Sequence, residues 1–179
     1  MADRNNMVIS VMDRDRAGIV AEVTEGISSL GGNLADLRES VLCDYFTMIL
    51  VADFPADITV SQVEDALSTG KSSRVSVEIA AGPLVNTAAS DQIYILSAVA
   101  KDRVGLVAQV SRFCCDRGVN IVDLASHVEG DQYTMMLQLE LSNIQSLEDF
   151  RTQLSKFGQS SSLNLVLQHN DIFRATNEI

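Results

Sequence analysis

Apolar positions along the chain follow strand and helix periods in the same order twice. Residues 7–12 and 93–99 are apolar runs of strand length, and both are rich in β-branched side chains. After Gly18, and again after Gly105, the apolar residues recur at helical spacing. They are Ile19, Val20, Val23, Ile27 and Leu30 in the first stretch, and Leu106, Val107, Val110 and Cys114 in the second. Each half of the chain is therefore predicted to begin with a strand and a helix.

Four more elements are predicted in each half. The next strands begin near Asn33 and Asn120, and the strands after them cover 45–51 and 132–141. Three-residue connections suit the two hairpins, one between Val41 and Tyr45 and one between Val128 and Gln132. The second helices begin with the capping-box sequences Ser61-x-x-Glu64 and Ser142-x-x-Gln145. Alternating strands close the halves near 75–79 and 163–167.

The two halves are copies of one another. Asp15–Val51 aligns without a gap on Asp102–Gln138, with 15 of 37 positions identical. Identity is concentrated in the turns around the first helix and in the third strand, whereas the middle of the helix diverges. A repeat of this period predicts two domains, and we place them at residues 5–82 and 91–170, with a linker at 83–90 and a tail at 171–179.

The order βαββαβ predicts an α+β chain of two ferredoxin-like units. Each unit is expected to be a four-stranded antiparallel sheet with two helices on one face and its first and third strands in the centre. The strands at 7–12 and 45–51 agree, because they are apolar on both faces. The face without helices then needs a second cover, and this predicts packing between copies or protomers, with a homodimer as the expected state.

Composition narrows the possible functions. The net charge of -11 repels phosphate backbones, so direct nucleic-acid binding is not expected. The chain begins without the apolar segment of a signal peptide, and its apolar runs are shorter than a membrane span, so a soluble cytoplasmic protein is expected. No metal or cofactor is expected from three cysteines without a Cys-x-x-Cys pair and two histidines. Without a Ser-His-Asp set, an enzyme is disfavoured.

The repeated polar turns are the candidate binding residues. Gly18 and Gly105 precede helices, where a missing Cβ would let a carboxylate approach backbone N–H groups; turn geometry is the alternative reason for them. Asp15 and Asp102 would meet an ammonium group or simply cap the helices. Asn33 and Asn120 suit either a ligand contact or a turn. Together, across an interface, these groups would suit an α-amino acid.

These motifs resemble the ACT domain family. The first copy carries Asp15-Arg-Ala-Gly-Ile-Val20, Gly31-Gly-Asn-Leu-Ala-Asp36 and Asp44-Tyr-Phe-Thr-Met48, and the second runs from Asp102 to Met135. The tandem layout is most similar to the glycine cleavage system transcriptional repressor group. The resemblance covers about nine tenths of the chain. The proline that often precedes the loop glycine in this family is Ala17 here and Val104 in the second copy.

The resemblance implies a sensor of small molecules, usually amino acids, held between ACT units. Carried onto this chain, the ligand-binding residues are Asp15, Gly18, Ile19, Asn33, Asp102, Gly105, Leu106 and Asn120. A non-enzymatic regulator of amino-acid metabolism, such as glycine metabolism, is then expected, with control of transcription passing through a DNA-binding protein partner. The alternative is a protein-interaction module with no ligand.

Overall fold

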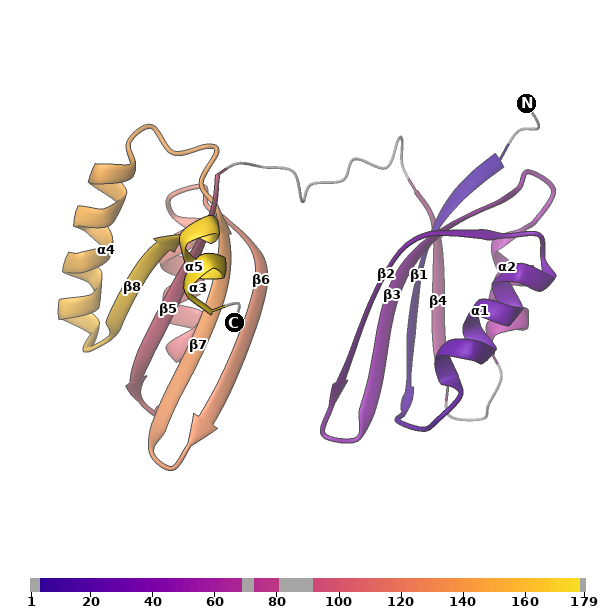
Figure 1. Ribbon diagram of the computed structural model, residues 1–179, viewed down its shortest axis with the longest axis horizontal. Helices are drawn as coiled ribbons and strands as arrows, with labels where there is room; N and C mark the ends of the chain where they lie inside the picture. Colours follow the sequence, from indigo (N-terminus) through magenta and orange to yellow (C-terminus); the bar gives the residue numbers. More distant parts are fainter. Residues whose placement is uncertain (1–3, 69–72, 81–91, 178–179) are drawn as a thin grey trace. The chain divides into compact units, whose positions relative to one another are not determined.

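The computed structural model describes residues 4–68, 73–80 and 92–177. The chain forms two compact units, Met1–Val85 and Asn86–Ile179, which we call unit 1 and unit 2 (Figure 1). The linker predicted at 83–90 lies outside the described residues, as do the ends of the chain.

Unit 1 has the predicted βαββαβ order, with two helices against one face of a four-stranded antiparallel sheet (Figure 1). Its elements are β1 (Arg4–Arg14), α1 (Ile19–Ser29), β2 (Asn33–Leu42), β3 (Tyr45–Pro55), α2 (Val60–Leu67) and β4 (Arg74–Ile79). The strand order β2-β3-β1-β4 places the first and third strands in the centre, as predicted. Each of these two strands is therefore hydrogen-bonded to a strand on both sides.

Unit 2 repeats this arrangement and adds one helix. Its elements are β5 (Ile93–Lys101), α3 (Leu106–Cys115), β6 (Asn120–Glu129), β7 (Gln132–Glu140), α4 (Leu147–Ser161), β8 (Asn164–His169) and α5 (Asn170–Asn177). The strand order β6-β7-β5-β8 is the same as that of unit 1. The predicted fold class is therefore confirmed for both copies.

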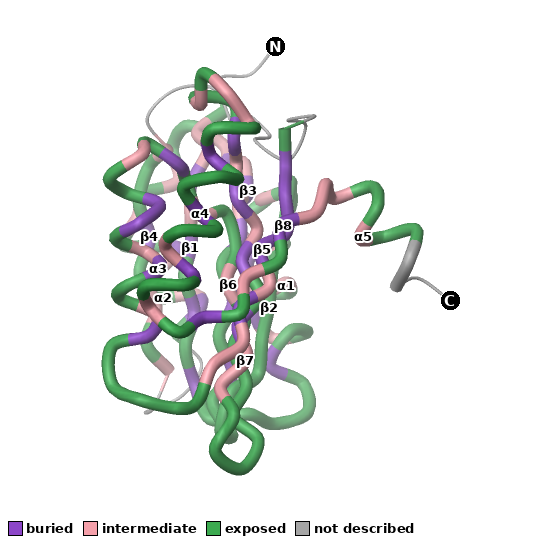
Figure 2. Tube along the Cα trace, turned by 90° about the vertical axis from the view of Figure 1, so that its left-hand side faces the viewer, coloured by how far each residue is buried: buried purple, intermediate pink, exposed green. Residues whose placement is uncertain are grey.

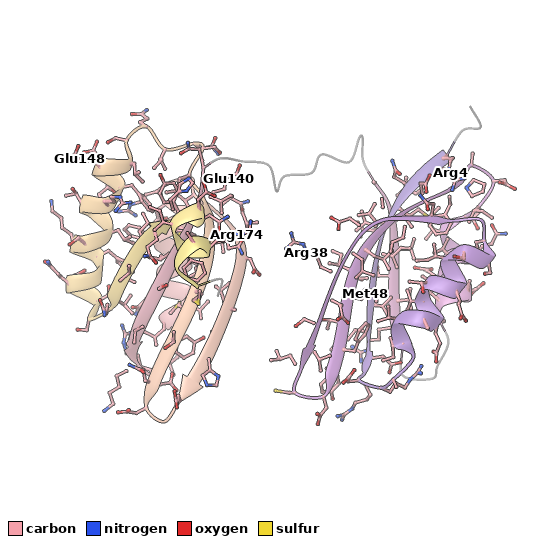
Figure 3. The ribbon with its side chains drawn as sticks, viewed as in Figure 1. Arg4, Arg38, Met48, Glu140, Glu148 and Arg174 are labelled. Carbon is pink, nitrogen blue, oxygen red and sulfur yellow. The ribbon has the colours of Figure 1, made fainter. Side chains whose placement is uncertain are left out.

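The core of unit 1 lies between its sheet and its two helices. Alternate residues of a strand point to opposite faces, so Met48 is 2% exposed whereas Ile49 is 53% exposed. Arg38 on β2 is paired with Ile49 on β3, so the two side chains lie on the same face of the sheet. Figure 3 shows the Arg38 side chain pointing away from α1 and α2. This second face mixes charged and apolar side chains and has no helix over it within the described part of unit 1.

The C-terminal residues form a helix where the sequence indicated only a tail. Helix α5 contacts β5 and β8 and lies on the side of the sheet opposite α3 and α4 (Figure 2). Ile93 and Ile95 point away from the face that carries α3 and α4, and they are nevertheless only 8% and 4% exposed. Unit 2 thus has the two predicted helices on one face, and α5 additionally lies over part of the second face.

Both predicted helix caps are wrong by a few residues. Helix α2 is capped by Thr59, whose side chain accepts from the backbone N–H of Gln62 while the Gln62 side chain accepts from the backbone N–H of Thr59. Helix α4 is capped by Ser146, which accepts from the backbone N–H of Asp149. The predicted positions, Ser61 and Ser142, lie inside α2 and before α4, respectively.

The hairpin connections are one residue shorter than predicted. Cys43 and Asp44 alone link β2 to β3, and both have positive φ, 49° and 63°. Positive φ at both central residues matches the twist of the flanking strands. Gly130 and Asp131 form a two-residue connection in unit 2 as well, but of these two only the glycine has a positive φ, 62°.

The three cysteines differ in burial, and this predicts their reactivity. Cys114 is buried, and burial raises the pKa of its thiol from 9.0 to about 11, whereas Cys43 and Cys115 are exposed. Since the thiolate is the reactive form, we expect a thiol reagent at pH 8 to modify Cys43 and Cys115 rapidly and Cys114 only on unfolding. Counting labelled sites by mass spectrometry with and without denaturant checks this. Rapid triple labelling of the folded protein would contradict it.

Candidate functional site

The loops from β1 to α1 and from β5 to α3 each place a glycine at the helix N-terminus. Gly18 has a φ of 96° and Gly105 a φ of 88°, in the left-handed region that side chains with a Cβ rarely adopt. Turn geometry therefore requires glycine at both positions. The first turn that follows presents N–H groups without intrahelical partners and the positive end of the helix dipole.

The space beside both glycines is also open. A Cβ at Gly105 would meet no described atom within 4 Å, and one at Gly18 would meet only Glu22 Oε1, at 3.8 Å. Another molecule can therefore reach the backbone at these positions. The sequence left two alternative reasons for these glycines, turn geometry and the approach of a ligand. The structure is compatible with both reasons at both positions.

Asp15 and Asp102 are not helix caps. The N-cap positions are Gly18 and Gly105, and no side chain caps either helix. The backbone N–H of Asp15 instead donates to the carbonyl of Asp44, at 2.9 Å, which ties the loop to the β2–β3 hairpin. The N–H of Asp102 makes the equivalent bond in unit 2, at 2.7 Å to Asp131. Both carboxylates lie on exposed residues and are accessible to a ligand.

Ile19 and Leu106 can serve a ligand only through their backbone. Their side chains are 4% and 2% exposed and belong to the two hydrophobic cores. The N–H groups of these residues begin the helices, so backbone donors are what they contribute to the predicted site.

Asn33 and Asn120 lie far from the loops of their own units. Asn33 begins β2, at the other end of α1 from Gly18 (Figure 1), and α1 has 11 residues, a length of roughly 16 Å. Asn120 stands in the same relation to Gly105, across the 10 residues of α3. One unit alone does not bring the predicted residues together. A loop and an asparagine can meet only where two units come together.

Each asparagine faces an acidic residue that the sequence reading missed. Asn33 is paired with Asp53 on β3, and Asn120 with Glu140 on β7. Asp53 is held by Arg4, whose Nε donates to Asp53 Oδ2 at 2.6 Å, while the buried Oδ1 atom has no hydrogen-bond partner among the described residues. Asp53 and Glu140 occupy equivalent positions in the two copies. An acidic residue repeated at this position is the sequence feature from which they could have been predicted.

A second repeated acid has a structural role. Both β2 and β6 have a bulge, and it falls directly before Asp36 in one and Asp123 in the other. The carboxylate of each accepts a hydrogen bond from the backbone N–H of the next residue, Leu37 or Leu124, at 2.8 and 3.0 Å. The repeated Asp-Leu pair is therefore explained by the bulge.

The two loops differ in charge. In unit 1, Arg16 makes a double hydrogen bond to Glu22, with both N–O distances 2.6 Å, and this bond raises the pKa of Arg16. In unit 2 the equivalent residues are Arg103 and Gln109, where Arg103 donates to the Gln109 amide oxygen at 3.0 Å. The guanidinium of Arg103 is thus not neutralised by the residue equivalent to Glu22, and the unit 2 loop is the more favourable one for an anionic group.

Unit 1 has a cavity of about 430 Å³ at the end of β1, immediately before the loop. It is lined by Met12, Asp13, Arg14, Tyr45 and Arg74. Asp13 is buried and accepts a hydrogen bond from Ser73 Oγ at 2.6 Å, and the Arg14 guanidinium lies 4.4 Å from the centre of the Tyr45 ring. None of the predicted ligand residues lines this cavity. The residue equivalent to Asp13 in unit 2 is Ala100, so comparison of the two copies did not point to Asp13 as a site residue.

No group of three His, Cys, Asp or Glu side chains among the described residues is placed to hold a metal ion. No helix among them is long and apolar enough to cross a membrane.

Sequence comparison identifies each half of the chain. ACT domain family models match residues 5–80 and residues 94–159. A UPF0237 protein of Listeria innocua is 29% identical over 86 residues, which are 48% of this chain and 97% of the relative. A UPF0237 protein of Methanocaldococcus jannaschii is 28% identical over 88 residues. The match to these relatives thus covers about half of this chain and nearly the whole of each relative.

Two solved structures match nearly the whole chain. A protein from Galdieria sulphuraria has a TM-score of 0.75 at 21% identity, with 93% of this chain and 98% of that chain covered. A protein solved under the name "putative glycine cleavage system transcriptional repressor" has a TM-score of 0.74 at 15% identity, with 92% and 96% covered. At these identities the likeness is one of fold.

Proposed function

Since the chain belongs to the ACT domain family and consists of two ACT domains in tandem, we propose that it is a non-enzymatic regulatory protein that binds an amino acid. The observation that carries this proposal is the repeated glycine, with positive φ and open space beside it, at the N-terminus of α1 and of α3. A carboxylate suits these helix N-termini, and Asp15 or Asp102 suits an ammonium group.

A complete site requires two units. Because Asn33 lies at the far end of α1 from Gly18, a ligand held by both a loop and an asparagine has to lie between units. We propose a homodimer in which the loop of one copy faces the start of β2 or β6 of the other. Asp53 and Glu140 would then join the asparagines on the ligand's other side.

The two units are not expected to bind equally. Glu22 places a carboxylate beside the open face of Gly18, and this carboxylate opposes an anionic ligand even though Arg16 neutralises part of its charge. In unit 2 the equivalent residue is the neutral Gln109, so this repulsion of an anionic ligand is absent there. We therefore propose Gly105, with Asp102, as the stronger site.

Regulation is proposed to pass through a protein partner. The net charge of -11 disfavours direct contact with DNA, so an effect on transcription needs a DNA-binding protein that responds to this chain. The likeness in fold to a structure named as a glycine cleavage system transcriptional repressor is the reason to include glycine among the first ligands tested. A ligand changes the partner contact only if it binds the two states with different affinity.

A thermal-shift screen tests the proposal. Each common amino acid is added at millimolar concentration to the full-length protein, with the decarboxylated amine and the deaminated acid of each as controls. A bound ligand stabilises by RT ln(1 + [L]/Kd), about 2.7 kcal/mol at a hundredfold excess over Kd. We expect at least one amino acid to raise Tm while its two controls do not. If no amino acid raises Tm, the chain is instead an interaction module without a ligand.

A further inference from the structure

A groove between α3 and α4 of unit 2 adjoins the site proposed above at Gln109 but is lined by none of the proposed ligand-binding residues. It has a volume of about 520 Å³ and takes side chains from both helices. Those that matter here are Arg112, Phe113, Arg117, Gln153, Lys156 and Phe157. A volume of this size is within the range of small-molecule sites, roughly 300 to 1,000 Å³.

A single difference between the two copies explains how α3 and α4 are spaced. In unit 1, Gly26 lets α1 lie close to α2: a Cβ on it would come within 2.7 Å of Leu67 Cδ2 and 3.2 Å of the Ala66 carbonyl oxygen. The equivalent residue of α3 is Phe113, whose ring stacks on Phe157 of α4 with 4.6 Å between ring centres. The aromatic pair therefore occupies the space between the helices in unit 2, and α3 and α4 are in less contact than α1 and α2.

The groove is cationic in an acidic chain. Arg112, Arg117 and Lys156 line it, three of the chain's 13 basic residues, against one carboxylate, Asp116. The residues equivalent to Arg112 and Arg117 in unit 1 are Glu25 and Leu30. This charge is therefore a property of unit 2 and not of the duplicated fold.

Arg117 is held in place before any ligand arrives. Its guanidinium lies 3.7 Å from the centre of the Phe113 ring. Nε donates to Gln153 Oε1 at 2.7 Å, and Nη1 donates to the Phe113 carbonyl oxygen at 2.9 Å. Nη2 makes no hydrogen bond within the described residues, which leaves its donors for a ligand. A pre-positioned guanidinium loses little entropy on binding and has the geometry that phosphate oxygens require.

From these observations we propose that the α3–α4 groove binds a phosphomonoester, a small molecule carrying a terminal phosphate. Three cations against one carboxylate leave an excess of two positive charges, which matches a phosphate dianion. Arg117 supplies oriented donors, and Arg112 and Lys156 supply charge from opposite sides of the groove, one on each helix. The ligand is expected to keep its non-phosphate part near the aromatic pair, since that pair contributes apolar surface to the groove.

Isothermal titration of the full-length protein with adenosine monophosphate, inorganic phosphate and adenosine tests this. We expect adenosine monophosphate to bind, adenosine not to bind, and Lys156→Glu to weaken the binding at least tenfold. Arg151→Glu is the matched control, because it makes the same charge change on the same helix but does not line the groove. It should change the affinity less than twofold.

Three results would overturn the proposal. One is no binding of either phosphate compound, and another is equal weakening by Lys156→Glu and Arg151→Glu, which would indicate unspecific charge attraction. The third is inorganic phosphate binding as tightly as adenosine monophosphate, which would indicate a free-phosphate site. The amino-acid response of Lys156→Glu should match that of the unmodified protein, so failure here is distinguishable from failure of the amino-acid proposal.

Discussion

Gly105→Ala is expected to abolish the rise in Tm that an amino acid produces through unit 2. A methyl group at Gly105 would occupy the open space through which the carboxylate reaches the backbone N–H groups of α3. It would meet no described atom within 4 Å, so the folded protein bears only the cost of a positive φ, about 1 to 2 kcal/mol. The measurement is the ligand-induced change in Tm, taken relative to the Tm of the same variant without ligand.

Gly118→Ala is the matched control for that substitution. Gly118 has a φ of 66° and equally open surroundings, but it follows the C-terminal end of α3 rather than its N-terminus. Its substitution should lower the baseline Tm by a similar amount and leave the amino-acid response intact. Loss of the response in both variants would mean that the effect reflects weakened folding, and retention in both would exclude the loop as the site.

Phe54→Ala is expected to lower the free energy of unfolding of unit 1 by about 3 to 5 kcal/mol, the range for aromatic truncation in a well-packed core. Phe54 is fully buried on β3. Its ring fills the space above Gly32, where a Cβ would approach Phe54 Cε1 to 2.5 Å. The loss is large against the total stability of a domain, about 5 to 15 kcal/mol. Urea unfolding followed by circular dichroism measures it.

Ile49→Ala provides the comparison on the same strand. Ile49 is 53% exposed on the face opposite the helices, so its truncation should cost about 0.5 kcal/mol or less. A cost for Ile49 as large as that for Phe54 would show that the second face of the sheet is buried in solution. That outcome would itself support packing of this face in a dimer.

Much of the fold was predictable because its signals are local. The apolar strand at 7–12 and the helical spacing after Gly18 depend only on which residues lie a few positions apart. The central position of β1 and β3 followed from the βαββαβ order, and the apolar residues on both faces of these strands agreed with it. The positive φ of Gly31 and Gly118 was predictable from their places after the first helices.

The errors arose where local signals compete. The sequence contains two overlapping capping boxes, Thr59-x-x-Gln62 and Ser61-x-x-Glu64, and only the first is used. Which one forms depends on where the chain leaves β3, and no short stretch of sequence determines this. Helix α5 has only 8 residues, too few to be stable alone, so its presence depends on contact with β5 and β8.

The candidate site divides in the same way. The two copies, their element order and the glycines at the helix N-termini follow from local patterns in the chain, because repeated turn residues have local conformational causes. Only the tertiary structure placed Asp53 opposite Asn33, separated the asparagines from the loops, and replaced the close α1–α2 contact with a cationic groove in unit 2. These features join residues distant in the chain, and they depend on strand register and side-chain packing, which a local pattern does not encode.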